Sequence, residues 1–199
     1  MTDAVCIRSA ATVILLRQAA TGAQVLMGQR GAAAAFMPSK YVFPGGAVDA
    51  GDHAKGHLSP ICQNQLTLNC LTDAPAPESI AGCALRELLE ETGLALAPAA
   101  PLLFLFRAIT PAGSPRRFDA RFFMADASHV LGDADDFSAA EDELSHLHWI
   151  GLAAARHLDL PFITEVVLAE VAAILDGHSQ PGVPFFDNSG PVPTFRRLI

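Results

Sequence analysis

Three glutamates, Glu87, Glu90 and Glu91, recur at the spacing of one helical face. Residues at positions i, i+3 and i+4 lie on the same side of a helix, so their carboxylates repel one another. Arg86 can pair with Glu90 one turn further on, which offsets only part of this repulsion. A divalent cation would relieve the rest, and an all-oxygen ligand set suits Mg²⁺ or Mn²⁺. The competing interpretation is an acidic stripe on a solvated helix.

The element that must position these carboxylates is the stretch of residues 78–94. Leu85, Leu88 and Leu89 fall on the face opposite the glutamates, which is the pattern of an amphipathic helix. Gly93 follows as a residue type on which helices commonly end. The stretch therefore predicts a helix that buries its leucines and presents its glutamates.

Two features accompany this helix, Glu78 at its start and the run Phe43-Pro44-Gly45-Gly46 upstream. Together they resemble the signature of the Nudix hydrolase superfamily, in which a glycine and a glutamate precede Arg-Glu-apolar-x-Glu-Glu-x-Gly-apolar. Residues 86–94 read Arg-Glu-Leu-Leu-Glu-Glu-Thr-Gly-Leu and match at every position. The family leaves five residues between the glycine and the first glutamate, whereas residues 47–77 separate Gly46 from Glu78 here. The chain thus resembles a Nudix box split by an insertion.

The resemblance implies a role for each of these residues. It implies cleavage of a diphosphate that links a nucleoside to another group, with Mg²⁺ or Mn²⁺ neutralising phosphoryl charge and activating water. The implied metal ligands are Glu87, Glu90, Glu91 and the Gly46 carbonyl. The catalytic residues that it implies are Glu90, Glu91 and Arg86, and Glu143 is added to them as the candidate base. In it Arg86 orients the carboxylates by salt bridging, with Glu78 as a partner.

The general base is sought outside the helix, because its identity varies across the family. Glu143, shortly before Trp149, is the leading candidate for a base or an additional ligand, and Glu141 is the second. For both residues, simple surface charge is the alternative.

The substrate class rests on finer features. The split box and the segment of residues 110–123 resemble the branch related to peroxisomal coenzyme A diphosphatases. Arg117, Arg121 and Arg30 are candidates for phosphate contacts, since a guanidinium matches phosphate in a bidentate way. Residues 116–125 alternate, so that Arg117, Asp119 and Arg121 point to one side of the expected strand and Phe118, Ala120 and Phe122 point to the other. A cross-strand ion pair with Asp119 is the alternative for Arg117 and Arg121. Coenzyme A or a derivative is the expected substrate.

Two other functions stay open. One is an ADP-ribose or dinucleotide pyrophosphatase. The other is a nucleotide-ligand-binding Nudix domain without catalysis, against which the intact glutamates argue.

Hydrophobic periodicity predicts the remaining elements. The expected strands are residues 9–17 and 24–30, which form a hairpin around a turn at residues 21–23, and residues 41–43, 102–110, 116–125 and 147–150. The expected further helices are residues 59–71, 151–158 and 163–175. With the helix of residues 78–94, these elements form an α/β chain, expected as an α/β/α sandwich with a mixed β-sheet in a single domain over residues 1–199. The tail from residue 182 is expected to pack as an irregular arm.

The insertion of residues 47–77 lacks a long apolar stripe and is expected at the periphery, as a lid or a dimer contact. His53 and His57 stand at i and i+4, a spacing that can ligate a metal, and solvated histidines are the alternative.

Composition excludes several classes of protein. The chain has 199 residues and is 51% hydrophobic, which excludes overall disorder. A formal net charge of −8 gives no basic field for nucleic acid or anionic membrane. The sequence has no Cys-x-x-Cys pair that would predict a zinc site, and it has no apolar run long enough to span a membrane. The expected partner is a small nucleotide substrate, the expected location is the cytoplasm, and a homodimer is possible.

Overall fold

The computed structural model describes residues 6–71, 73–178 and 181–199. The strands are β1 (Ile7–Ala19), β2 (Gly22–Arg30), β3 (Tyr41–Val42), β4 (Gly45–Ala47), β5 (Leu103–Ile109), β6 (Arg117–Asp126), β7 (Leu144–Gly151), β8 (Val183–Asp187) and β9 (Thr194–Leu198). The helices are α1 (Pro60–Thr67), α2 (Pro77–Thr92), α3 (Leu152–Ala155) and α4 (Phe162–Leu175), with a 3₁₀ turn at Ala127–His129.

All described strands join one mixed sheet. Its order is β3-β2-β1-β6-β5-β8-β9, with β4 beside β1 and β7 beside β2. The pairs β1–β6 and β5–β8 are parallel, while pairs such as β1–β2 and β5–β6 are antiparallel. The expected mixed sheet is confirmed, and so is the β1–β2 hairpin.

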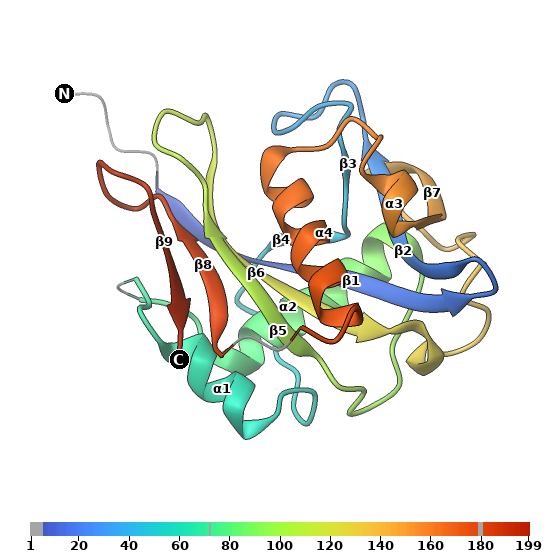
Figure 1. Cartoon of the computed structure of the whole chain (residues 1–199), viewed down its shortest axis with the longest axis horizontal. Coiled ribbons are helices and arrows are strands. Elements are labelled where there is room, and N and C mark those ends of the chain that lie inside the picture. Colours follow the sequence, from blue (N-terminus) through green and yellow to red (C-terminus); the bar gives the residue numbers. More distant parts are fainter. Residues whose placement is uncertain (1–5, 72, 179–180) are drawn as a thin grey trace.

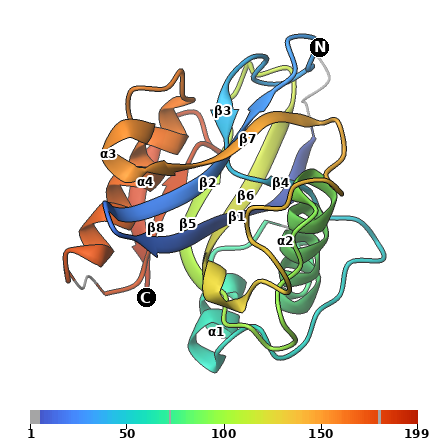
Figure 2. The ribbon, with the colours of Figure 1, turned by 90° about the vertical axis from the view of Figure 1, so that its right-hand side faces the viewer.

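Helices cover both faces of this sheet (Figures 1 and 2). Alternate residues of β1 face opposite sides, as in any strand. Val13 and Leu15 pack into the cluster that contains α1 and α2, whereas Ile14 packs into the cluster that contains α3 and α4. The expected α/β/α sandwich is therefore confirmed. Among the helices in the described part of the chain, none has the length and apolar content that crossing a membrane requires.

The expectation of an irregular C-terminal arm was wrong. The tail forms β8 and β9, an antiparallel hairpin that extends the sheet beyond β5. Phe185 is fully buried in the cluster with α2. The strands are short and separated by Gly and Pro residues, so the alternation was too brief to be recognised from sequence.

The expectation of a peripheral insertion was also wrong. Ser59 is the N-cap of helix α1, and its hydroxyl accepts a hydrogen bond from the Cys62 amide (3.2 Å). The side chains of Leu58, Cys62 and Leu66 are buried in the same core cluster as α2. Cys62 and Leu66 lie one turn apart on α1, and together with Leu58, which precedes the helix, they cover part of the sheet.

The two histidines of the insertion are separated by their surroundings. His57 is buried, with Nδ1 2.8 Å from the Ala100 carbonyl oxygen, and His53 is exposed. The segment around them is not helical, so the i, i+4 spacing does not bring them together as a metal-binding pair.

Candidate active site

The acidic helix α2 has the predicted start and end, but its buried face is wider than expected. Gly93 ends it in the left-handed conformation (φ 75°), and its amide donates to the Leu89 carbonyl. Glu91 is only 2% exposed and Glu87 is 8% exposed, whereas Leu89 is half exposed. The expected inward position of Leu89 was wrong, because strand β4 covers the glutamate side of the helix.

The two glycines of β4 let the strand approach these carboxylates. The Gly45 amide donates to Glu91 Oε2 at 2.7 Å. A Cβ atom at Gly46 would lie 2.3 Å from Glu87 Oε1, so any larger residue would displace that carboxylate. The Gly46 carbonyl accepts a hydrogen bond from the Cys83 thiol at 3.5 Å. Glycine is thus required here by close approach, not by a turn.

Burial and like charge make ionised carboxylates unfavourable at this place. Burial, with the charges of Glu87 and Glu143, raises the pKa of Glu91 to about 8 despite the bond from Gly45. Burial also raises the pKa of Glu87, to which Glu90 and Glu143 add, while Arg86 opposes the shift. The positive charge present at the site, on Arg86 and Arg30, therefore balances its carboxylates only in part.

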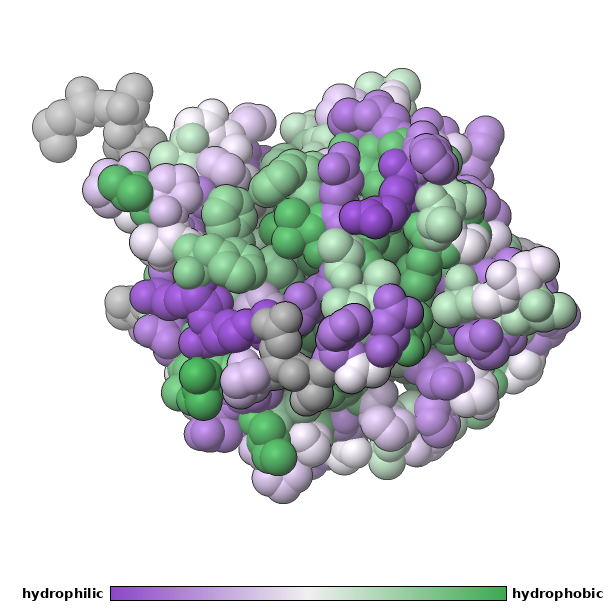
Figure 3. All heavy atoms as spheres, viewed as in Figure 1, coloured by the Kyte–Doolittle hydropathy of each residue, from purple (hydrophilic) through white to green (hydrophobic). Residues whose placement is uncertain are grey.

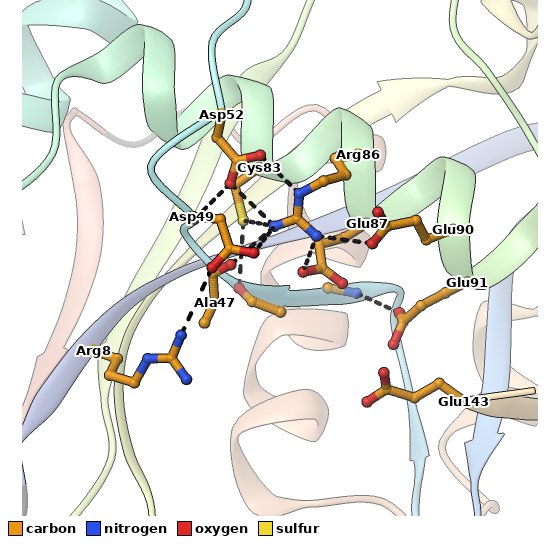
Figure 4. A network of polar contacts seen from close by, with 12 residues as sticks. Arg8, Ala47, Asp49, Asp52, Cys83, Arg86, Glu87, Glu90, Glu91 and Glu143 are labelled. Atoms are coloured by element: carbon orange, nitrogen blue, oxygen red, sulfur yellow. Dashed lines mark hydrogen bonds and ion pairs between the residues drawn. The ribbon is translucent and has the colours of Figure 1, made fainter. Parts of the chain in front are cut away.

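Arg86 is the hub of the polar network (Figure 4). Its Nη1 donates to Glu87 Oε1 and to Glu90 Oε2, both at 2.8 Å. Its Nε and Nη2 donate to the two oxygens of Asp52, at 2.7 and 3.0 Å. In the described part of the chain no ion pair joins Arg86 to Glu78, its expected partner. The hydrogen-bonded acidic partner outside the helix is Asp52, from the insertion, while Asp49 lies further away, at 3.9 Å.

Glu143, which directly precedes β7, reaches the same site from a distant part of the chain. Figure 4 shows its carboxylate facing Glu91, and its Oε1 accepts from Arg30 Nη2 at 2.8 Å. Glu141 is exposed, and its backbone amide donates to the Glu90 carbonyl at 2.8 Å. The structure therefore brings the first candidate base to the carboxylates and uses the second one to hold the loop against α2.

A cavity of about 440 Å³ opens beside this network, on the face of the sheet that carries α4. Glu87, Glu143 and Arg30 line one part of it. Much of the remaining wall is aromatic, formed by Phe118, Phe122, Phe162 and Phe186. In Figure 3 apolar residues gather between the β5–β6 connection and α4 on this face. The volume is that of a pocket for a small organic ligand.

Two of the three arginines expected at substrate lie elsewhere. Arg121 is fully buried on the face of the sheet that carries α1 and pairs with Asp119 (3.0 Å), so its assignment to substrate phosphates was wrong. Arg117 is not at the cavity; it donates to the carbonyls of Thr110 (3.0 Å) and Asn188 (2.6 Å). The strand alternation was predicted correctly, but the cavity lies on the phenylalanine side of β6. Of the three, only Arg30 lines it.

Comparison with solved structures finds proteins of one fold. The chain is similar to a NUDIX hydrolase from Alicyclobacillus acidocaldarius (24% identity, 84% of this chain and 92% of that chain covered, TM-score 0.60). It is also similar to an Ap4A hydrolase of C. elegans in a binary complex (19%, 86% and 99%, 0.53) and to the NUDIX domain of Shewanella oneidensis NrtR complexed with ADP ribose (15%, 85% and 89%, 0.58). The chain has the Nudix fold. No protein-family model and no curated protein matches the sequence.

The residues at the acidic helix of this Nudix fold suit a hard divalent cation. Glu91 Oε1 is buried and has no hydrogen-bond partner within the described residues, and the other potential metal ligands, the Glu87 and Glu90 carboxylates and the Gly46 carbonyl, are also oxygens. Across residues 6–71, 73–178 and 181–199, no three Asp, Glu, His or Cys side chains are already gathered closely enough to form a cation site. Arg86 holds Glu87 and Glu90, so binding would require small side-chain movements.

Several residues of the site were not identified from the sequence. Asp52 lies inside the insertion, where no periodic pattern marks it. Phe118 and Phe122 were recognised as the opposite side of an alternating strand, but not as a cavity wall. Arg8 and Arg116 also line the cavity and had no motif to identify them.

Proposed function

We propose that the chain is a divalent-metal-dependent hydrolase that cleaves the diphosphate bond of a nucleoside diphosphate linked to another group. The observation that carries this proposal is the buried Glu91 carboxylate, whose Oε1 has no hydrogen-bond partner among the residues that the structure describes, on the same helix as Glu87, which lines a ligand-sized cavity. Burying a carboxylate is costly unless it is paired or binds a metal. The Nudix fold of the neighbours supports the same reaction.

Each residue has a proposed task. Glu87, Glu90 and Glu91, with the Gly46 carbonyl, would hold Mg²⁺ or Mn²⁺, which when bound would neutralise phosphoryl charge and lower the pKa of water. Glu143 is the proposed base, because its carboxylate faces this cluster and is partly open to solvent.

Arg30 is the proposed phosphate contact. It lines the cavity, and its buried Nε has no hydrogen-bond partner within the described residues. The Arg30–Glu143 ion pair would keep both groups at the same end of the cavity.

Two substrates are supported by different observations. The split box favours coenzyme A or its derivatives. ADP-ribose is supported by the neighbour that was crystallised with it, and the aromatic walls suit a nucleobase in either case. The loss of Arg121 from the site removes one argument for coenzyme A. A non-catalytic nucleotide-binding domain is the competing function of another class.

The test is a substrate panel with Mg²⁺ and with Mn²⁺, read by product masses. Coenzyme A cleavage should give 3′,5′-ADP and 4′-phosphopantetheine, whereas ADP-ribose should give AMP and ribose 5-phosphate. Glu90→Gln should remove most of the turnover and leave the metal-free melting temperature equal or slightly higher, because a charge leaves a repelling cluster. A variant with wild-type turnover at saturating Mg²⁺ would contradict the metal assignment of Glu90.

A further inference from the structure

The cavity has a second group of cationic side chains, Arg8 and Arg116, in addition to Arg30 at the carboxylates. Arg8 lies on β1 and Arg116 directly precedes β6, and both residues line the cavity. The parallel pairing of the two strands places Arg8 beside Phe118. Arg116 stands two residues before Phe118, so strand alternation puts the three side chains on the same face. Two guanidinium groups therefore flank one aromatic ring at the cavity wall.

The protein neutralises these two arginines only weakly. Arg8 Nη2 lies 3.9 Å from Asp49 Oδ1, and both side chains are mostly exposed. An ion pair of that length and exposure contributes little. Among the residues that the structure describes, Arg116 takes part in no ion pair. Two positive charges at this corner thus face one loosely held negative charge.

The aromatic ring between the arginines is held in place by a second ring. Phe36, from the connection between β2 and β3, contacts Phe118 edge to face, with ring centroids 5.3 Å apart, and both rings line the cavity. A phenylalanine fixed in this way offers a flat surface on which a planar group such as a nucleobase can stack. The corner therefore combines a surface for a base with two cationic donors for an anion.

This corner is separate from the place where the carboxylates meet. Gly45, whose amide binds Glu91, pairs with Thr12 of β1, and Arg8 lies four residues before Thr12. At roughly 3.3 Å per residue, the two levels of the strand are about 13 Å apart. Figure 4 shows Arg8 and Glu143 at opposite sides of the polar network. An anion bound at Arg8 is therefore a different group from a diphosphate held at the carboxylates.

We infer that Arg8 and Arg116 bind a phosphate monoester on the ribose of the substrate, and so select nucleoside diphosphate derivatives that carry this extra phosphate. The inference rests on the proposed function, since it assumes that the scissile diphosphate lies at the carboxylates. A guanidinium binds phosphate oxygens through parallel hydrogen bonds, and a phosphate monoester carries close to two negative charges at neutral pH. Coenzyme A has such a group at its ribose 3′ position, and ADP-ribose has none.

The test compares compounds that differ by this phosphate alone. Coenzyme A is paired with 3′-dephospho-coenzyme A, and NADP⁺ with NAD⁺, so the two arms separate a 3′-phosphate from a 2′-phosphate. In one pair, wild type should have the higher kcat/KM for the phosphorylated compound, through a lower KM. Arg8→Gln and Arg116→Gln should each reduce this preference by about 3- to 10-fold. The matched control Arg156→Gln removes an exposed arginine that does not line the cavity, and should keep the preference within about twofold of wild type.

Binding of product nucleotides gives a second readout that needs no cleavage. In calorimetry with Mg²⁺, wild type should bind 3′,5′-ADP or 2′,5′-ADP more tightly than AMP, and the double variant Arg8→Gln, Arg116→Gln should lose this difference. Equal affinity of wild type for all three nucleotides would overturn the inference, as would an equal loss of kcat/KM on both members of a pair in the variants.

The failure of the inference and the failure of the proposed function have different signatures. A wild-type protein that prefers the bisphosphate nucleotide but cleaves none of the four compounds would overturn the proposed hydrolase and support the phosphate site. A wild-type protein that cleaves both members of each pair with equal kcat/KM would support the hydrolase and overturn the phosphate site.

Discussion

Asp119→Asn should destabilise the protein strongly, although Asp119 does not line the cavity. Its carboxylate accepts from Arg107 Nε and Nη2, both at 2.7 Å, and lies 3.0 Å from Arg121 Nη2. All three side chains are at most 1% exposed, and the two arginines are directly opposite each other on β5 and β6. One buried carboxylate therefore balances the positive charges of two buried arginine side chains.

The size of the effect follows from this charge balance. Removing one partner of a buried ion pair costs about 3–5 kcal/mol, because it leaves buried charge without compensation. This is a large share of the roughly 5–15 kcal/mol by which a domain is stable. With a urea m-value of about 2 kcal/mol per molar, the unfolding midpoint should fall by about 2 M.

The assay is urea unfolding followed by circular dichroism, with two comparison variants. Asp135→Asn breaks the Arg17–Asp135 pair, which has the same 2.7 Å length but an exposed carboxylate, so it should cost less than about 1 kcal/mol. Arg121→Met leaves the Arg107–Asp119 pair neutral and should cost less than Asp119→Asn. A midpoint for Asp119→Asn as high as that of Asp135→Asn would refute the reasoning. A rise in KM with normal stability in Arg121→Met would restore a substrate role for that arginine.

Three further perturbations have defined outcomes. The pKa of Glu91 is raised from 4.5 to about 8, so this group should contribute fully to the stability of the metal-free protein below about pH 4.5. That contribution should be lost as the pH rises to about 8. Glu91→Gln should therefore make the melting temperature in EDTA less dependent on pH between about pH 5 and 8. Gly46→Ala should displace the Glu87 carboxylate and lower kcat by on the order of 100-fold in a steady-state assay with Mn²⁺. An unchanged kcat would show that Glu87 can make room for a methyl group without loss of activity. Replacing residues 56–74 by a Gly/Ser linker should abolish the cooperative thermal melt, since it removes the buried side chains of Leu58, Cys62 and Leu66 from the core; a sharp melt would mean that the core forms without them.

The sequence alone determined the elements whose signals are local. Helix α2 followed from leucine spacing and from Gly93, and the β1–β2 hairpin followed from two apolar runs around a short turn. The alternation of β6 was also correct, including the fact that Arg121 and Asp119 share a side. These features depend on backbone periodicity and steric preference, which neighbouring residues are sufficient to express.

Only the tertiary structure decided which charges meet. Arg86 pairs with Asp52 because the insertion folds back over Gly82, and Arg121 is buried because α1 covers that face of the sheet. The family resemblance implied Glu78 for the first pairing, and the match of a guanidinium to phosphate suggested a substrate phosphate for the second. A strand pattern divides residues between two faces without saying which face holds the cavity. That choice depends on which helix packs on which side, and it is fixed by burial of apolar surface contributed by residues far apart in the chain.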